Sequence, residues 1–286
     1  MARSSAIDAL WAGRARRARV LVDERPHTAA ILRFYLSLLE IQTAVVREVN
    51  VQPLSPAVQT PDGTLPSLDL TRLPLDPLSA GFLELCRGMP PSAPAPVLEA
   101  ARTAAAAAAS RRADLLLALL VGDDPGRCAD ALAGQPAPLV FLARAFLSPV
   151  VERLAAAGPG DLAAARTPLC PRCGWPPQVS RLEDEAGAEG NRRLVCAFCA
   201  TGWVFPRSVC AACGATGDDG LEFHADERLG HVRVEACRSC RSYLKTVDLR
   251  VLGLAEPLVD DLATPELDLW AESQGLEKIV PNLLGL

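Results

Sequence analysis

The sequence predicts an α+β protein of several domains, in which an all-α N-terminal domain is followed by two small zinc-ribbon-like tetracysteine metal modules and a C-terminal helix. Three observations lead to this fold class. Residues 1–166 carry apolar side chains at spacings of three and four, as one face of a helix requires. Eight of the ten cysteines then fall in four CxxC pairs. Between the pairs lie short alternating runs that are typical of β-hairpins.

The helical half is expected to contain four long helices and one short one between proline-rich segments. Their predicted ranges are 6–22, 29–49, 78–87, 97–121 and 138–157. In the last of them, Pro149 is expected to bend the helix. After Gly158, aliphatic residues give way to cysteine, glycine and turn residues, so the helical domain is assigned to residues 1–166.

The cysteine half contains an internal duplication. Its four CxxC pairs are Cys170/Cys173, Cys196/Cys199, Cys210/Cys213 and Cys237/Cys240. A shift of 40 residues places the first pair on the third, and a shift of 41 places the second on the fourth. Each copy has 22 or 23 residues between its pairs, whereas ten residues separate the copies. We therefore expect sequential pairing, with one metal ion in residues 167–206 and one in residues 207–286, which also contain the C-terminal helix.

Two CxxC turns supply four thiolates to one ion, which completes tetrahedral coordination and leaves no position for a substrate. The donor set suits both zinc and iron, so the pattern alone does not select the metal. A thioredoxin-like redox pair is the alternative for a single CxxC, but four pairs at duplicated spacing argue against it. A purely structural role stays open, because a structural zinc contributes on the order of 10 kcal/mol to the folding of small metal domains.

Charge is distributed unevenly along the chain. Residues 1–166 hold 17 Lys and Arg against 16 Asp and Glu, whereas residues 167–286 hold 12 against 18. Metal-bound thiolates add negative charge, so a protein partner is favoured over a nucleic acid. No stretch approaches about 20 consecutive apolar residues, so direct membrane insertion is not expected. Cysteines at metal-binding spacing favour the reducing cytoplasm. Charged residues, instead of the apolar stretch of an export signal, follow Arg16 and Arg17, which also favours the cytoplasm.

Few other residues suggest chemistry. Cys86 and Cys128 are interpreted as buried apolar thiols, and the three histidines as ordinary surface or turn residues. Trp175 and Trp203 lie beside CxxC turns and are expected to pack over the metal cores. The sequence contains no phosphate-binding loop, nucleophile elbow or dinucleotide glycine pattern, so the chain is not expected to be an enzyme.

The cysteine runs carry a resemblance to a known family. CPRCGWPP begins at Cys170, LVCAFCATGWVFPRSVCAACG ends at Gly214, and ACRSCRSYLKTVD spans residues 236–248. Together with the tail DDLATPELDLWAESQGLEKIVPN at residues 260–282, these runs resemble the formate dehydrogenase accessory protein FdhE family. The resemblance covers residues 167–282, while the N-terminal half shares only its helical character and an Arg-rich first segment.

This resemblance implies a helical domain followed by two rubredoxin-like modules, with iron favoured over zinc as the metal in both. It implies a cytoplasmic accessory factor that is required to produce active formate dehydrogenase. The implied partner is the catalytic subunit of that enzyme, and the chain itself is not expected to oxidise formate.

Three functional hypotheses follow. The leading one is a noncatalytic maturation factor, or chaperone, that docks the catalytic subunit through an acidic surface held by the metal modules. The second is an iron-dependent electron-transfer factor that acts on the formate dehydrogenase active site, because iron changes oxidation state and zinc does not. The third is a zinc-ribbon nucleic-acid module, which the acidic charge opposes.

The candidate partner-binding residues of the leading hypothesis are Tyr243, Lys245, Asp248, Asp260 and Asp261. For the two adjacent aspartates, a place at the start of a helix is the simpler explanation, because a helix N-terminus favours negative charge.

Overall fold

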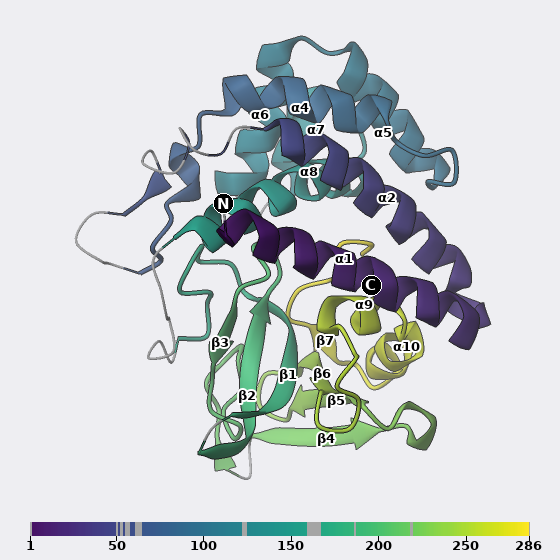
Figure 1. The fold of residues 1–286 in the computed structure, drawn as a ribbon, viewed down its shortest axis with the longest axis vertical. Coiled ribbons are helices and arrows are strands. Elements are labelled where there is room, and N and C mark those ends of the chain that lie inside the picture. The colour runs from purple at the N-terminus through teal and green to yellow at the C-terminus, as the bar shows by residue number, and fades with distance from the viewer. Residues whose placement is uncertain are drawn as a thin grey trace. The chain divides into compact units, whose positions relative to one another are not determined.

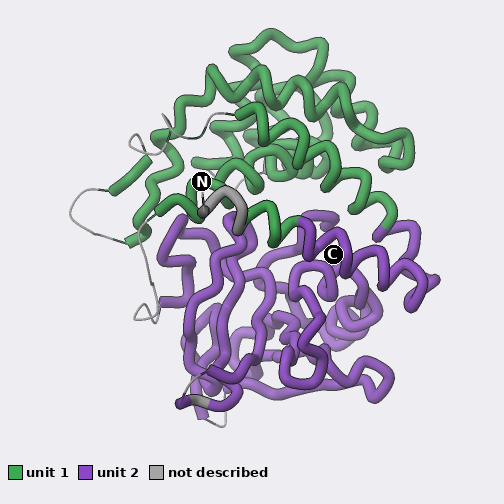
Figure 2. The backbone as a smooth tube through the Cα atoms, in the orientation of Figure 1, with its two compact units in different colours: residues 1–11, 33–158 green, residues 12–32, 159–286 purple. Residues whose placement is uncertain are grey.

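The chain forms a helical region followed by a β-sheet and short C-terminal helices (Figure 1). The computed structural model describes residues 2–49, 51, 54, 58–60, 65–121, 125–158, 167–185, 187–217 and 220–285. The chain divides into two compact units, coloured separately in Figure 2. The helical unit comprises Met1–Trp11 and Arg33–Gly158, and the sheet unit comprises Ala12–Leu32 and Pro159–Leu286.

Helix α1 (Ala2–Glu24) contributes to both units. The sequence predicts instead that all of residues 1–166 belong to one helical domain. Residues 12–32 belong to the sheet unit because Arg17 and Arg25 form ion pairs with Asp260 and Glu266. The predicted boundary at residue 166 falls in the segment 159–166, which lies outside the described residues.

The helical unit is built from α2 and the helices that follow it. Their bounds are α2 (Ala29–Glu48), η3 (Leu70–Arg72), α4 (Leu75–Arg87), α5 (Ala95–Ala106), α6 (Ala109–Val121), α7 (Pro125–Leu132) and α8 (Pro136–Ala157). The single helix predicted over residues 97–121 is in fact α5 and α6. The break occurs at Ala107, whose backbone is extended and whose carbonyl accepts a hydrogen bond from the Arg112 side chain. Helix α7 was not predicted from the sequence.

Helix α8 forms the centre of the helical unit, and most of its residues are buried. Its Phe146 packs against Phe82 of α4 with ring centroids 5.7 Å apart. Gly81 permits this approach, since a Cβ atom at that position would lie 3.1 Å from the Phe146 ring. Pro149 lies inside α8 and does not end it. The core of this unit is therefore one central helix enclosed by its neighbours.

One segment, Pro26–Glu48, is long and apolar enough to cross a membrane by length and composition, and 50% of its apolar window is buried. Within it, Phe34, Leu38 and Val46 are buried. Gln42 donates a hydrogen bond of 2.6 Å to the carbonyl of Ala145 in α8. A core helix of a globular unit meets the same criteria, and these contacts are those of a core helix.

The sheet unit contains a sheet with the strand order β3-β2-β1-β6-β5-β4 (Figure 1). The first copy supplies β1 (Pro177–Glu185), β2 (Ala188–Cys196) and β3 (Gly202–Val204), and the second supplies β4 (Leu221–Ala225), β5 (Val232–Cys237) and β6 (Ser242–Asp248). Strands are antiparallel within each copy. The copies join where β1 and β6 run parallel, with Val179 opposite Lys245. The two predicted modules thus share one sheet.

Two short helices, α9 (Pro257–Leu262) and α10 (Pro265–Ser273), follow the sheet, and β7 (Glu277–Lys278) pairs with β6. The sequence predicts one C-terminal helix, but the chain turns between α9 and α10. Pro265 occupies the first turn of α10, where proline is well tolerated. One hydrophobic cluster contains residues from both copies and from α10, namely Val179, Val195, Leu229, Val232, Val234, Ala236, Tyr243, Val247, Leu267, Ala271 and Leu276.

Candidate metal centres

The same backbone turn follows each CxxC pair. After the first pair of each copy, a glycine amide donates to the carbonyl of the first cysteine, at 2.8 Å for Gly174 and 3.0 Å for Gly214. Both glycines have positive φ, 81° and 78°, in a region that side chains disfavour. Ala200 and Arg241, after the second pairs, also have positive φ, 53° and 60°. This shared turn directs both sulfurs of each pair to the same point.

The first cluster consists of Cys170, Cys173, Cys196 and Cys199. The Sγ atoms of Cys170 and Cys199 are 3.5 Å apart, and those of Cys173 and Cys196 are 3.4 Å apart. All four ligand atoms lie within 4.8 Å of one another. The first two CxxC pairs therefore meet, as sequential pairing predicts.

The second cluster consists of Cys210, Cys213, Cys237 and Cys240. Its corresponding sulfur separations are 3.8 Å between Cys210 and Cys240 and 3.7 Å between Cys213 and Cys237. A tetrahedral ion with zinc–sulfur bonds holds its ligands about 3.8 Å apart. The second cluster matches this spacing, and the first is slightly tighter. Each cluster could hold one metal ion.

Backbone amides support the ligand sulfurs. The amide of Arg172 lies 3.4 Å from Cys170 Sγ, and that of Ala212 lies 3.3 Å from Cys210 Sγ. The amide of Phe198 lies 3.3 Å from Cys196 Sγ. Donation of N–H groups to sulfur favours the thiolate, which is the form that binds metal.

The thiols of each metal-free cluster ionise unequally. In the first cluster, burial raises the pKa of Cys173 and Cys196, whereas hydrogen bonds from the other three cysteines lower the pKa of Cys170. In the second, burial raises the pKa of Cys210 to about 12. Burial also opposes ionisation of Cys240, but hydrogen bonds from Ser242 and from Cys213 and Cys237 together outweigh it and lower the pKa to about 7. Metal binding must therefore displace protons from the remaining thiols.

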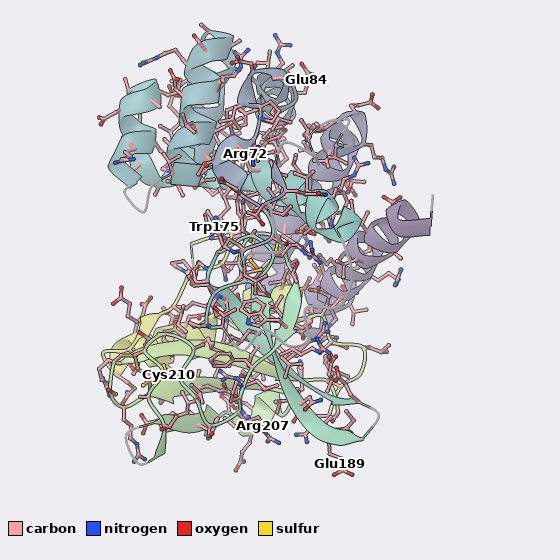
Figure 3. The ribbon with its side chains drawn as sticks, turned by 90° about the vertical axis from the view of Figure 1, so that its left-hand side faces the viewer. Arg72, Glu84, Trp175, Glu189, Arg207 and Cys210 are labelled. Atoms are coloured by element: carbon pink, nitrogen blue, oxygen red, sulfur yellow. The ribbon has the colours of Figure 1, made fainter. Side chains whose placement is uncertain are left out.

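The two clusters differ in exposure. All four cysteines of the first cluster are buried, whereas in the second Cys213 is exposed and Cys240 is half-buried. Figure 3 labels Trp175, whose carbonyl accepts a hydrogen bond from the Cys170 amide beside the first cluster, and Cys210 of the second.

Two aromatic side chains of the first copy lie beside the first cluster. Trp175 and Phe198 stack with ring centroids 4.2 Å apart and an interplanar angle of 11°. Phe198 stands between Cys196 and Cys199 in sequence, so the stack lies beside the first cluster, and the packing of Trp175 over the metal core stays a prediction. Trp203 is fully buried in β3 and donates a hydrogen bond to the carbonyl of Thr167.

A buried ion pair links the two copies. Arg192 of β2 lies 2.7 Å from Glu235 of β5, and both side chains are 1% exposed, although the pair is not aligned as a hydrogen bond. The Arg192 guanidinium also donates to the carbonyls of Pro206 and Val209, at 3.1 and 3.0 Å. Val209 directly precedes Cys210, so a side chain of the first copy holds the segment that begins the second cluster.

Four of the five predicted partner-binding residues are buried. Tyr243, Lys245, Asp260 and Asp261 are at most 2% exposed, and Asp248 is half-buried and paired with Arg250. A direct contact with a partner needs exposed side-chain atoms. The structure therefore assigns these four side chains an internal role, which corrects the expectation that they form the contact surface.

Their internal role is a network of ion pairs. Lys245 Nζ lies 2.8 Å from Asp261 and 2.6 Å from Asp268, and Lys278 Nζ lies 2.8 Å from Asp261. The Tyr243 hydroxyl donates to Asp268 at 3.0 Å. Burial alone would raise the pKa of Asp261, but the two lysines outweigh it and lower the pKa to about 2. This network joins β6 to α9, α10 and β7.

A second group of ion pairs anchors the segment 12–32. Arg17 of α1 donates to both carboxylate oxygens of Asp260, with contacts of 2.6 and 3.0 Å, and His231 lies 2.9 Å from Asp260. Arg25 pairs with Glu266 and donates to a backbone carbonyl. Asp260 does lie in the first turn of α9, as a helix-start residue should. Sequence reasoning missed these pairs because Arg17 and Asp260 are 243 residues apart.

The two cysteines outside the CxxC pairs agree with their interpretation. Cys86 and Cys128 are buried in the helical unit. Burial raises the pKa of Cys86 to about 12, so this thiol stays protonated and behaves as an apolar side chain.

The duplicated sheet defines a protein with two tetracysteine clusters, each of which could hold a metal ion. Models of known families match both copies, as FdhE, central domain over residues 169–207 and as FdhE, C-terminal domain over residues 209–284. The chain belongs to the FdhE family, as its cysteine runs and C-terminal tail predict.

Curated relatives and a solved structure agree with this assignment. Protein FdhE homolog of Aquifex aeolicus is 41% identical over 116 residues, which are 41% of this chain and 41% of the relative. Protein FdhE homolog of Stutzerimonas stutzeri is 38% identical over 117 residues, or 41% of this chain and 38% of the relative. The match thus spans about two fifths of the length of these relatives. The crystal structure of the FdhE protein from Pseudomonas aeruginosa aligns over 96% of this chain and 95% of that chain, with a TM-score of 0.73 and 26% identity.

Proposed function

We propose that this chain is a cytoplasmic accessory factor in the maturation of formate dehydrogenase, and that it docks the catalytic subunit of that enzyme. The observation that carries this proposal is the pair of tetracysteine clusters, which lie in the two segments that match the FdhE family. Eight reduced cysteines in metal-binding positions suit a reducing compartment.

The eight cysteines are proposed as metal ligands, with iron favoured over zinc because the family resemblance implies it. Bound iron would supply one-electron redox chemistry, whereas zinc would supply none. The ligands themselves hold the ends of the strands together at both clusters. Their direct effect is to fix the surface of the sheet unit for docking.

Exposed apolar side chains of the sheet unit are the proposed contact surface. Val251 is 63% exposed, Leu254 is 85% exposed and Leu269 of α10 is 64% exposed. Val251 and Leu254 are three residues apart in the chain, and exposed apolar side chains that form one patch are typical of protein-binding surfaces. The buried residues Lys245 and Asp261 would act indirectly, by positioning α9 and α10.

The test is complementation of a bacterium from which the FdhE gene has been deleted, with formate dehydrogenase activity in extracts as the readout. The wild-type chain is expected to restore activity and to co-purify with the catalytic subunit. The variant Val251→Asp/Leu254→Asp is expected to retain both metal ions and to lose co-purification. Leu117→Asp, at an exposed apolar position of the helical unit, is the matched control and should behave as wild type. A folded, metal-loaded wild-type chain that restores no activity would refute the proposal.

The metal with which the chain restores activity distinguishes docking alone from electron transfer. Zinc-loaded and iron-loaded chains, each added to extracts of the deletion strain, are compared for the activity that they restore. Equal restoration by zinc excludes electron transfer and leaves docking, because zinc does not change oxidation state. Restoration by iron alone would replace docking with the redox function.

A further inference from the structure

The two copies place different side chains at equivalent positions around their clusters. The shifts that superpose the cysteines place Ala215 on Trp175 and Ser239 on Phe198. The aromatic stack beside the first cluster is therefore replaced by a methyl group and a hydroxymethyl group. Nothing in the coordination geometry requires this change, since both clusters are built from the same turns and positive φ values.

The substitution coincides with a difference in access to the ligands. Phe198 is 1% exposed, whereas Ser239 is exposed. Every cysteine of the first cluster is buried, whereas Cys213 is exposed and Cys240 is half-buried. A small molecule can therefore approach Cys213 of the second cluster from solvent, while no cysteine of the first cluster is exposed. The shell around a metal site controls such access.

We propose that the second cluster is a ligand-exchange site, at which a thiol from another molecule replaces Cys213 as a metal ligand, and that the first cluster is closed to this exchange. The bond from the metal to Cys213 sulfur breaks as the bond to the incoming sulfur forms. The proton of the incoming thiol passes to the released Cys213 thiolate. No electron is transferred, and the charge of the site is unchanged.

This inference goes beyond docking, because it assigns the two clusters different tasks. The first cluster holds the sheet unit together, and the second can share its metal with a thiol-bearing molecule. It does not depend on formate dehydrogenase as the client, and its test contains no formate dehydrogenase. The two proposals can therefore fail separately.

The test uses the full chain loaded with two zinc ions and an excess of the chelator 4-(2-pyridylazo)resorcinol, whose colour reports zinc release over time. Release is expected in two phases of one zinc each, with the faster rate about 10- to 100-fold higher, which is the size of the change in metal affinity when the shell around a site is altered. Glutathione should accelerate the fast phase in proportion to its concentration and leave the slow phase unchanged. A single phase for both ions, or a fast phase that is indifferent to thiol, would overturn the proposal.

Exchanging the side chains at these two positions between the copies shows which cluster gives which phase of zinc release. Ala215→Trp/Ser239→Phe should slow the fast phase toward the slow one, and Trp175→Ala/Phe198→Ser should make the slow phase fast and thiol-dependent. If the second variant fails to fold, the first still decides. Phe223→Ser, which removes an exposed aromatic side chain from β4, is the matched control and should change neither phase.

Chemical trapping locates the released ligand. The zinc-loaded chain is first incubated with glutathione, and a short pulse of N-ethylmaleimide in excess over all thiols then follows. It should alkylate Cys213 first, as identified by mass spectrometry of peptides. Equal labelling of the first-cluster cysteines would overturn the assignment. A reduced cysteine-containing peptide at the same thiol concentration distinguishes the sources of the ligand. Equal acceleration by both supports exchange with any accessible thiol, and greater acceleration by the peptide supports exchange with a protein thiol.

Discussion

The two tetracysteine clusters share a backbone design and differ in the side chains around it. Each is built from two CxxC turns followed by positive φ, and each gathers four sulfurs within 4.8 Å. The first lies beside stacked Trp175 and Phe198, whereas the second leaves Cys213 exposed. The comparison teaches that ligand geometry and ligand access are encoded by different residues. The cysteines and turn residues determine the first, and their neighbours determine the second.

The copies also differ in what supports them. In the second copy, β6 carries Tyr243 and Lys245 into the buried ion-pair network with α9, α10 and β7. The duplication places Gly202 and Val204 of β3 at these positions, and neither side chain can form an ion pair. The second copy thus has an internal support besides its metal. We expect the first copy to depend more strongly on its own metal.

Removing one ligand from each cluster should have the largest and most unequal effect. Cys196→Ser should abolish folding of the sheet unit, since a buried structural metal contributes on the order of 10 kcal/mol. Cys213→Ser should weaken the binding of one metal ion and leave the sheet unit folded, because the ion-pair network remains when the second cluster loses its metal. Metal content by mass spectrometry and thermal unfolding by circular dichroism measure both effects. Equal destabilisation by the two substitutions would show that neither the exposure of the ligands nor the ion-pair network distinguishes the clusters.

The cysteine ligands and their pairing could be predicted because their geometry is local. A CxxC turn directs two sulfurs within four residues, and the spacing between pairs limits which pairs can meet. The parallel pairing of β1 with β6 could not be predicted in this way, since it joins residues 66 positions apart, as Ser180 and Thr246 are. The same holds for Arg17 and Asp260, at a separation of 243. Each of these residues has an ordinary local explanation, and only the fold brings the partners together.

The buried network should respond strongly to the loss of one charge. Lys245→Met removes one of the two lysines that pair with Asp261 and Asp268 and leaves both buried carboxylates to Lys278 alone. Breaking a buried pair destabilises by about 3–5 kcal/mol. The free energy of unfolding of the sheet unit, from urea titration, is the measurement. The double variant Lys245→Met/Asp261→Leu should recover much of the loss, because the pair of Lys278 and Asp268 remains balanced.

An exposed ion pair of the same copy provides the control. Arg238 pairs with Glu222 at 3.2 Å, with 60% of the Arg238 side chain exposed. Arg238→Met should change stability by less than about 1 kcal/mol, as exposed pairs do. If Lys245→Met has as small an effect, the network contributes no support and the asymmetry between the copies is confined to the clusters.

The link between the copies should have a smaller effect than the network. Arg192→Met removes the buried partner of Glu235, but Glu235 keeps Arg233 at 3.2 Å. We therefore expect a loss of about 3 kcal/mol, the lower end for a broken buried pair. The segment before Cys210 also loses two hydrogen bonds, so zinc release from the second cluster should accelerate while release from the first is unchanged. Equal acceleration at both clusters would mean that Arg192 supports the whole sheet instead of joining one copy to the other cluster.

The smallest effect is a spectroscopic one that reports on the second copy alone. Burial, and then the charge of Asp268, raise the pKa of Tyr243. Because the folded pKa exceeds the unfolded value of about 10, this contribution to stability is fully present below pH 10 and is lost as the pH rises further. The chain has two tyrosines, so a Tyr35→Phe background leaves Tyr243 as the single phenol.

Absorbance at the phenolate band should stay flat above the ordinary tyrosine pKa until circular dichroism shows that the sheet unit unfolds. Alkaline pH keeps thiolates ionised and the metals bound, so the transition tests the internal support of the second copy. Phenolate that forms while the sheet is intact would show that Tyr243 is accessible to solvent, and the second copy would then lack the support that separates it from the first.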